Sequence, residues 1–299
     1  MEKAKARKLS QSKRYNLTGW VFLTPAALLI AVFSFYPMIK CFIYSFQKGS
    51  TFANMQWYGI NNYIRMFQDK VFMKSLGNTF IYFLIQVPIM LILALILASM
   101  LNNKDLKFKG FFRTAIFLPC ATTLVSYAII FRSLFSTDGF VNTILMKLGI
   151  LDAPFAFLTN TTGARAVIIL ALVWRWTGYN MVFYLSGLQN IEYSVYEAAK
   201  IDGASPMQSF FHITVPLLKP TILLTAIMST NGTLQLFDES VNLTNGGPAN
   251  TSITMSHYIY DATFKYVPNF GYSCAMSILI LVLVGTLAFI QMKVGDKRD

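Results

Sequence analysis

Charged residues are scarce in this sequence. Only 13% of the 299 residues are charged, against about a quarter in an average soluble domain, and the mean hydropathy is +0.51. The apolar residues stand in long blocks, without the period of 2 or 3.6 residues that marks half-buried strands and amphipathic helices. A soluble globular fold is therefore excluded, and lipid is the expected surrounding of most of the chain.

Residues that bind metals or carry redox chemistry are also few. The three cysteines, Cys41, Cys120 and Cys274, lie within or beside apolar blocks, and no two have the spacing of a metal or redox motif. They are interpreted as small apolar packing residues. His212 and His257 have no neighbour at metal-ligand spacing, so each is expected to pack or to face water. No metal site is predicted.

Catalytic and nucleotide-binding motifs are missing. The chain has no G-x-x-x-x-G-K-[ST] phosphate loop, no zinc-protease motif and no nucleophile elbow. The net charge of +12 arises from Lys and Arg in short gaps between the apolar blocks, and no basic face is formed for nucleic acid. The chain is therefore predicted to hold no catalytic residue and no cofactor of its own.

The charge-free stretches predict an all-α polytopic membrane protein with about six spans. Each stretch is close to the ~20 apolar residues that cross the hydrocarbon core. The predicted spans are 17–38, 75–103, 114–131, 166–189, 214–237 and 271–292. The first run is too long for the h-region of a signal peptide, about 7–15 residues, so it is expected to remain as a span.

The distribution of Lys and Arg predicts the orientation. Residues 1–16 form a basic tail that precedes a transmembrane domain, 17–299, and the gap before the third span is basic as well. The connections on the other side are longer and carry fewer positive charges. By the positive-inside rule both termini are expected in the cytoplasm. Residues 138–149, on the outer side, are expected to form a short amphipathic helix.

The cytoplasmic segment 190–216 carries two helix-start signals. Ser194 and Glu197 have the S-x-x-E spacing of a capping box, and Gly203 is placed to end that helix in the left-handed conformation. Ser205 then begins a second signal, S-P-x-Q. The segment is predicted to fold as helix, sharp turn, helix.

The same segment resembles the EAA loop of ABC importer permeases. The family pattern falls on Glu197-Ala198-Ala199, then Gly203, then Ile213-Thr214-Val215-Pro216, with Val215 where the family usually has leucine. The resemblance implies that this loop couples the chain to an ATPase. The residues implied in coupling are Glu197, Ala198, Ala199, Asp202, Gly203 and Pro216.

Two further stretches are similar to maltose-type carbohydrate permeases. Residues 174–189 are similar to the fourth span of such permeases, and residues 237–251 to the outer loop of the first of two paired permeases. The resemblance implies a subunit of the bacterial inner membrane that forms a pore for a carbohydrate, an oligosaccharide being expected. The implied partners are a second permease in a heterodimer, two cytoplasmic ATPase subunits that bind ATP and Mg, and an extracytoplasmic substrate-binding protein.

Polar residues in apolar spans are the candidates for the translocation path. They are Arg175, Asn180, Asn231, Gln235 and Asp238. Arg175 is expected either to face a cavity or to snorkel to the outer interface. The amides either join helices or contact sugar hydroxyls. Asn231 and Gln235 are four residues apart, so on a helix they share a face, which is expected to meet Asn180.

Two alternative functions remain open from the sequence. An ion-coupled secondary transporter would favour buried carboxylates near mid-membrane, and the spans lack them apart from Asp238 and Glu239 at an outer end. An ABC permease for glycerol phosphate would share the EAA loop and differ only in substrate.

Overall fold

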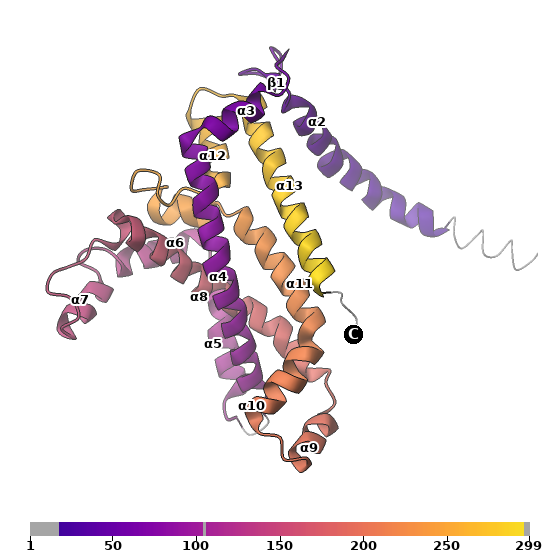
Figure 1. Cartoon of the computed structure of the whole chain (residues 1–299), viewed down its shortest axis with the longest axis vertical. Coiled ribbons are helices and arrows are strands. Elements are labelled where there is room, and N and C mark those ends of the chain that lie inside the picture. Colours follow the sequence, from indigo (N-terminus) through magenta and orange to yellow (C-terminus); the bar gives the residue numbers. More distant parts are fainter. Residues whose placement is uncertain (1–17, 104–105, 296–299) are drawn as a thin grey trace, which may run out of the picture.

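The computed structural model describes residues 18–103 and 106–295, and these form a bundle of long helices (Figure 1). The predicted basic tail, 1–16, and the charged residues Lys104, Lys297 and Arg298 lie outside the described residues. The α-helices are α2 (Tyr36–Tyr44), α3 (Asn61–Gln68), α4 (Lys70–Asn102), α5 (Lys109–Ala121), α6 (Leu124–Leu134), α7 (Phe140–Lys147), α8 (Thr161–Gln189), α9 (Tyr193–Ile201), α10 (Pro206–Ser209), α11 (Val215–Leu234), α12 (Met255–Tyr260) and α13 (Phe270–Gly295). A small antiparallel pair, β1 (Gln47–Lys48) and β2 (Gln56–Trp57), lies beside α3.

Five of the described helical segments are long and apolar enough to cross a membrane. They are Thr18–Tyr44, Lys70–Asn102, Thr161–Gln189, Pro206–Leu234 and Phe270–Gly295. The bent pair α5 and α6 makes a sixth if the two count as one span. The chain is an all-α polytopic membrane protein, as predicted, and a helix, α7, forms within residues 138–149, where a short helix is predicted.

The third span is broken, which corrects the prediction of one continuous helix over 114–131. α5 and α6 meet at an angle of 98°. Pro119 lies in the last turn of α5, and the two residues that follow α5, Thr122 and Thr123, have extended backbones. The Thr123 side chain accepts a hydrogen bond from the Ser126 amide, so it caps the start of α6.

The fifth span is displaced toward the N-terminus of the chain relative to the predicted 214–237. The helix begins at Pro206 with a capping box and ends at Leu234. The start lies earlier because a π-helical stretch, Phe210–Thr214, joins α10 to α11 without a break. Residues 235–239 therefore lie beyond the end of α11, where they line a cavity between α4, α8 and α11.

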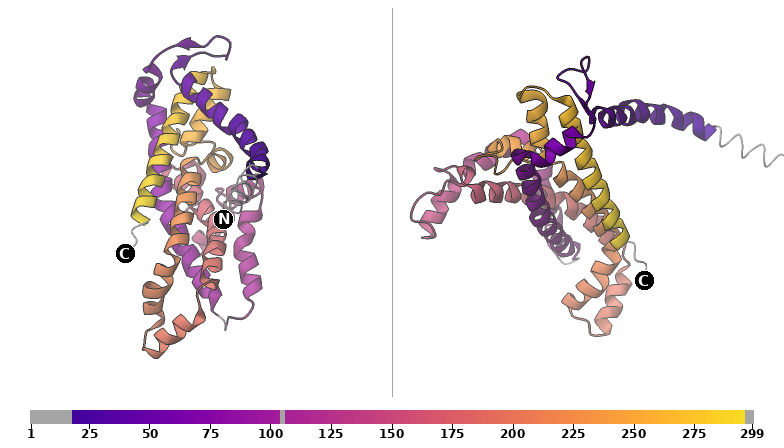
Figure 2. Two further views of the ribbon diagram at one scale, coloured as in Figure 1. Left: turned by 90° about the vertical axis from the view of Figure 1, so that its right-hand side faces the viewer. Right: turned by 45° about the horizontal axis from the view of Figure 1, so that its top comes forward.

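The first helix stands apart from the bundle. Thr18–Tyr44 projects outward, and its most apolar 18-residue window has no buried residue (Figures 1 and 2). Contact is made at its C-terminal end, where α2 packs against the start of α13. Gly271 allows this approach, since an added Cβ would stand 1.7 Å from the Gln47 carbonyl oxygen.

Helix α8 is the centre of the bundle and packs against α4, α5 and α11. Its N-terminus is capped by the Asn160 side chain, which accepts from the Thr162 and Gly163 amides at 2.9 and 3.0 Å. Gly178 brings α5 into backbone contact, because an added Cβ would stand 2.0 Å from the Ile116 carbonyl oxygen. This close packing fixes the faces of α8 that line the site.

Candidate functional site

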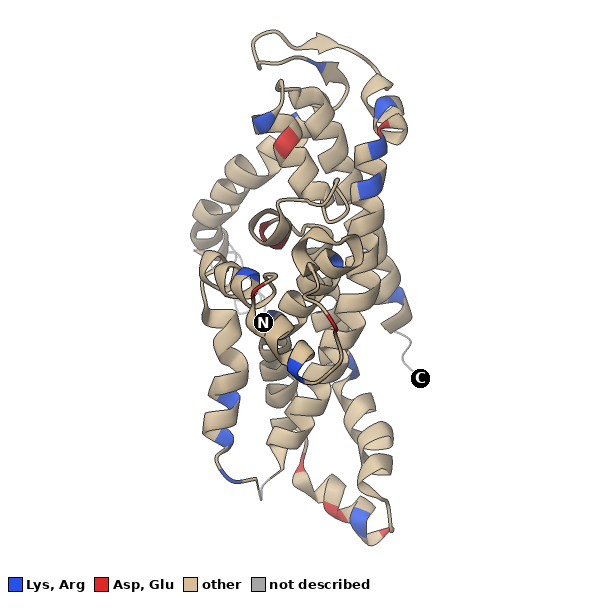
Figure 3. Cartoon of the chain, turned by 90° about the vertical axis from the view of Figure 1, so that its left-hand side faces the viewer, with Lys and Arg blue, Asp and Glu red and all other residues tan. Residues whose placement is uncertain are grey.

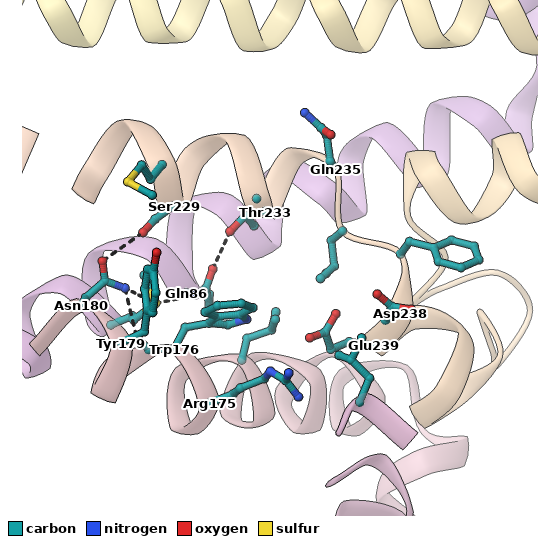
Figure 4. A pocket seen from close by; sticks show the side chains of 17 residues that line it. Gln86, Arg175, Trp176, Tyr179, Asn180, Ser229, Thr233, Gln235, Asp238 and Glu239 are labelled. Carbon is teal, nitrogen blue, oxygen red and sulfur yellow. Dashed lines mark hydrogen bonds between the residues drawn. The ribbon is translucent and has the colours of Figure 1, made fainter. Parts of the chain in front are cut away.

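A cavity of about 450 Å³ lies between α4, α8, α11 and the segment that follows α11. Figure 4 shows its side chains. The lining residues are Gln86, Met90, Leu124, Leu172, Arg175, Trp176, Tyr179, Asn180, Met228, Ser229, Gly232, Thr233, Gln235, Leu236, Phe237, Asp238 and Glu239. The volume is within the 300–1,000 Å³ that small-molecule sites occupy, and apolar walls with a few polar groups are typical of them.

Arg175 faces this cavity, so the snorkelling interpretation is wrong. Its side chain is buried, and its guanidinium stands 4.8 Å from the Tyr127 ring centre and 5.4 Å from that of Trp176. Among the described residues, Nε and Nη1 have no hydrogen-bond partner. Buried donors without partners are costly, and a bound polar group would satisfy them.

Two consecutive carboxyl groups, Asp238 and Glu239, complete the charged part of the wall (Figure 4). Glu239 is 4% exposed, and burial raises the pKa of its carboxyl above the ordinary value of 4.5. Asp238 is one of the residues predicted for the path, whereas Glu239 is not. The only sequence signal for Glu239 is that it directly follows Asp238. Its side chain points into the cavity because of how the chain turns after α11, which the sequence does not predict.

Amide and hydroxyl groups form the other end of the cavity. Asn180 donates to the Trp176 carbonyl oxygen at 3.0 Å and accepts from the Ser229 hydroxyl at 3.5 Å. Gln86, which the sequence analysis did not select, accepts from the Thr233 hydroxyl at 2.8 Å. These bonds join α8 to α11 and α4 to α11, so Asn180 both joins helices and lines the cavity.

The predicted meeting of Asn231 and Gln235 with Asn180 is wrong. The two side chains hydrogen-bond to each other, and both are exposed. Gln235 lines the cavity mouth with its amide directed away from Asn180 (Figure 4), and Asn231 is not among the lining residues. The helix ends at Leu234, and it is Ser229, about one and a half turns earlier, that faces Asn180.

A second candidate site is the turn between α9 and α10, at the far end of the bundle (Figure 1). Gly203 has a φ of +82°, in the left-handed region, as predicted for the residue that ends the first helix. The capping box at Ser205 is confirmed, with Ser205 and Gln208 bonded reciprocally. The segment folds as helix, sharp turn, helix.

The capping box predicted at Ser194 is wrong. α9 begins at Tyr193 after the N-cap residue Glu192, and no side chain caps its first amides. The Ser194 hydroxyl instead donates to the Glu192 carboxylate at 3.4 Å, and Glu197 is exposed. Glu197 is therefore available for contact with another molecule.

The residues of the EAA pattern are presented on the surface of this end. Ala198, Asp202, Gly203 and Pro216 are exposed, and Ala199 is half-buried. α9 carries acidic and basic residues together (Figure 3). Large apolar side chains are exposed beside them, namely Tyr193, Val195, Ile201, Met207 and Phe211. Exposed apolar residues gathered with charges are typical of a protein-docking surface.

Comparison with known proteins finds the same architecture elsewhere. Residues 67–298 match the family model "binding-protein-dependent transport system inner membrane component". The chain is 48% identical over 291 residues to the lactose transport system permease protein LacF of Rhizobium radiobacter, covering 97% of each chain. It is 34% identical to the arabinooligosaccharides transport system permease protein AraP of Bacillus subtilis, covering 92% of this chain and 88% of the relative.

A solved structure shares the fold. A bacterial alginate ABC transporter, in complex with an alginate pentasaccharide-bound periplasmic protein, contains a chain that superposes with a TM-score of 0.83. The sequence identity is 22%, and 96% of each chain is covered.

A helical membrane bundle around a central cavity, together with the family match over residues 67–298, defines a transport subunit. The chain belongs to the family of inner-membrane components of binding-protein-dependent transport systems. It is thus a multi-pass membrane protein.

Proposed function

We propose that the chain is the permease subunit of an ABC importer for an oligosaccharide, with a disaccharide such as lactose as the first candidate. The observation that carries this proposal is the 48% identity to a lactose permease over nearly the whole of both chains. Chains 31–34% identical are named for arabinooligosaccharides and for multiple sugars, which supports a carbohydrate over glycerol phosphate.

The cavity between α4, α8 and α11 is the proposed translocation path. Trp176 and Tyr179 present aromatic faces, and Arg175, Asp238, Gln235 and Asn180 present donors and acceptors suited to hydroxyl groups. Asn231 is left out of the path because it does not line the cavity.

The charge of the cavity favours an uncharged saccharide. If Glu239 is ionised, two carboxylates stand against the single guanidinium of Arg175, and if it is protonated, the charges balance. In neither state does the wall carry the excess positive charge that would offset the desolvation of an anionic sugar. The fold alone does not decide this point, because the superposed alginate transporter imports an acidic polysaccharide.

The exposed turn between α9 and α10 is the proposed ATPase-docking surface. Two ATPase subunits would bind there and would hold the ATP and Mg, so that this chain remains non-catalytic. A second permease would complete the pore, and a substrate-binding protein would dock on the opposite end. The complex of the superposed alginate transporter with its periplasmic protein supports the last of these partners.

The orientation follows from the same assignment. With α9 and α10 in the cytoplasm, β1, β2 and α3 lie outside, and both termini are cytoplasmic. The excess of Lys and Arg in the predicted cytoplasmic segments supports this arrangement.

Uptake of labelled lactose tests the substrate. The complete transporter would be expressed in a host without other lactose transport, and uptake should require this chain. Uptake should survive an uncoupler that collapses ion gradients when ATP is maintained, and should stop when ATP is depleted. If the uncoupler abolished uptake while ATP was maintained, an ion-coupled transporter would be supported instead. Competition of labelled lactose uptake by maltose, raffinose and galacturonate would define the class of sugar that is carried.

A further inference from the structure

Two of the three cysteines meet where the first helix joins the bundle. Cys41 lies on α2 and Cys274 on α13, 233 residues apart in the chain. The Cys41 Sγ is 4.0 Å from the Cys274 carbonyl oxygen, so the side chain of Cys41 lies directly against Cys274 where α2 packs on α13. Both cysteines are partly exposed.

The backbones are held close together at this point. The Cβ that Gly271 lacks would stand 3.1 Å from the Tyr44 carbonyl oxygen and 1.7 Å from that of Gln47. Phe52 and Phe270 stack beside it with ring centres 4.5 Å apart. This contact keeps the two cysteines adjacent, as a disulfide requires, because a bridge forms only between Cα atoms within about 7 Å.

We propose that Cys41 and Cys274 are a redox-active dithiol that closes to a disulfide at the outer face of the membrane. Two S–H bonds break and one S–S bond forms, while the disulfide of a small-molecule or protein oxidant is reduced and takes up the two protons. Each cysteine is about one helical turn from the outer end of its helix, Tyr44 or Phe270, and therefore lies close to the aqueous phase.

The bridge would fasten the first helix to the bundle. Thr18–Tyr44 has no buried residue in its most apolar window, so its position depends on the contact at its C-terminal end. A covalent link from α2 to α13 would hold this end while the rest of the helix remains free to contact the membrane or another subunit. Cys120, on α5, is the third cysteine and serves as an internal reference.

Thiol counting on the assembled transporter tests the proposal. Right-side-out membrane vesicles are incubated with oxidised glutathione, free thiols are blocked with N-ethylmaleimide, and the protein is denatured, reduced and labelled with polyethylene-glycol maleimide. Wild type and Cys120→Ser should each gain two adducts, whereas Cys41→Ser and Cys274→Ser should gain at most one, from the mixed disulfide that the remaining thiol forms with glutathione. Mass spectrometry of unreduced wild type should find the peptides of Cys41 and Cys274 linked, a measurement independent of how the variants fold.

Absence of the linked peptide after glutathione treatment would overturn the proposal, and so would its formation only in inside-out vesicles. The outer location rests on the orientation proposed above, but the thiol count does not depend on transport. Lactose uptake measured on the same vesicles separates the disulfide proposal from the proposed function. If the disulfide forms and lactose is not taken up, only the substrate assignment is contradicted.

Discussion

At the scale of single residues, the central feature is Arg175, a buried arginine whose Nε and Nη1 have no hydrogen-bond partner among the described residues. Insertion of an arginine at a helix centre costs about 2.5–3.5 kcal/mol, so such a residue is kept for a reason beyond folding. Here the aromatic rings of Tyr127 and Trp176 hold the guanidinium beside the cavity. The two rings thus orient Arg175 toward the cavity and leave Nε and Nη1 free to donate to a ligand.

Arg175→Gln should lower lactose uptake about tenfold or more per assembled complex. A hydrogen bond to a charged group is worth about 1.5–3 kcal/mol, and 1.4 kcal/mol is a factor of ten. Uptake would be normalised to complex isolated from the same membranes. Asn231→Leu is the matched control, because Asn231 stands outside the cavity, and its uptake per complex should stay near wild type. An Arg175→Gln variant with normal uptake would remove Arg175 from the path.

At the scale of helices, backbone contact between α5 and α8 sets the shape of the cavity wall. Gly178 permits this contact, and the 98° bend after Pro119 lets side chains of α6 pack with the first half of α8. Neither feature adds a polar group to the site. The α5–α8 contact and the break after Pro119 together determine which face of α8 lines the cavity, and therefore which of its polar residues do so.

Gly178→Ala should destabilise the subunit by about 1–3 kcal/mol, the usual cost of overpacking. The added Cβ would meet the Ile116 carbonyl oxygen, a backbone atom that cannot rotate away. Thermal unfolding in detergent would measure the change. Gly77→Ala on α4 is the control, since an added Cβ there meets no atom within 4 Å, and it should be neutral or slightly stabilising.

Gly203→Val should weaken binding of the ATPase while the subunit still inserts. No atom lies within 4 Å of the added Cβ, so the effect comes from the backbone, whose φ of +82° a β-branched residue disfavours. Pull-down of the ATPase and transport would both be measured. Gly149→Val is the matched control, with φ of +68° and open space around it at the opposite side, and it should leave docking intact. Equal docking by all three proteins would contradict the coupling role of the turn.

At the scale of the whole molecule, the two sites lie at different levels of one bundle. α8 and α11 line the cavity and continue to the turn region, since α9 and α10 connect the end of α8 to the start of α11. A force applied at α9 would therefore act on the same two helices that surround the cavity. This connection gives the proposed coupling a mechanical route through the chain itself.

The orientation of the bundle predicts which surfaces an impermeant thiol reagent reaches. In a variant without native cysteines, Ala249→Cys should be labelled in intact cells, whereas Lys107→Cys and Lys200→Cys should be labelled only after the membrane is opened. All three positions are exposed on the isolated chain, so the membrane alone distinguishes them. Labelling of Lys107→Cys from outside would reverse the proposed orientation.

The sequence by itself determined the class of the protein and the turn between α9 and α10. Long charge-free blocks dictate membrane helices because unpaired backbone groups are too costly in lipid, and this requirement is local to each block. The left-handed Gly203 and the Ser205 capping box are equally local, since they involve residues only a few positions apart.

Only the tertiary structure decided which residues meet across the bundle. The break at Pro119, the end of α11 at Leu234 and the inward turn of Glu239 change which side chains reach the cavity. Asn180 consequently meets Ser229 instead of Asn231, and Cys41 meets Cys274 over 233 residues. Contacts of this kind depend on how helices cross and where they bend, and periodicity within one helix carries no information about its neighbour.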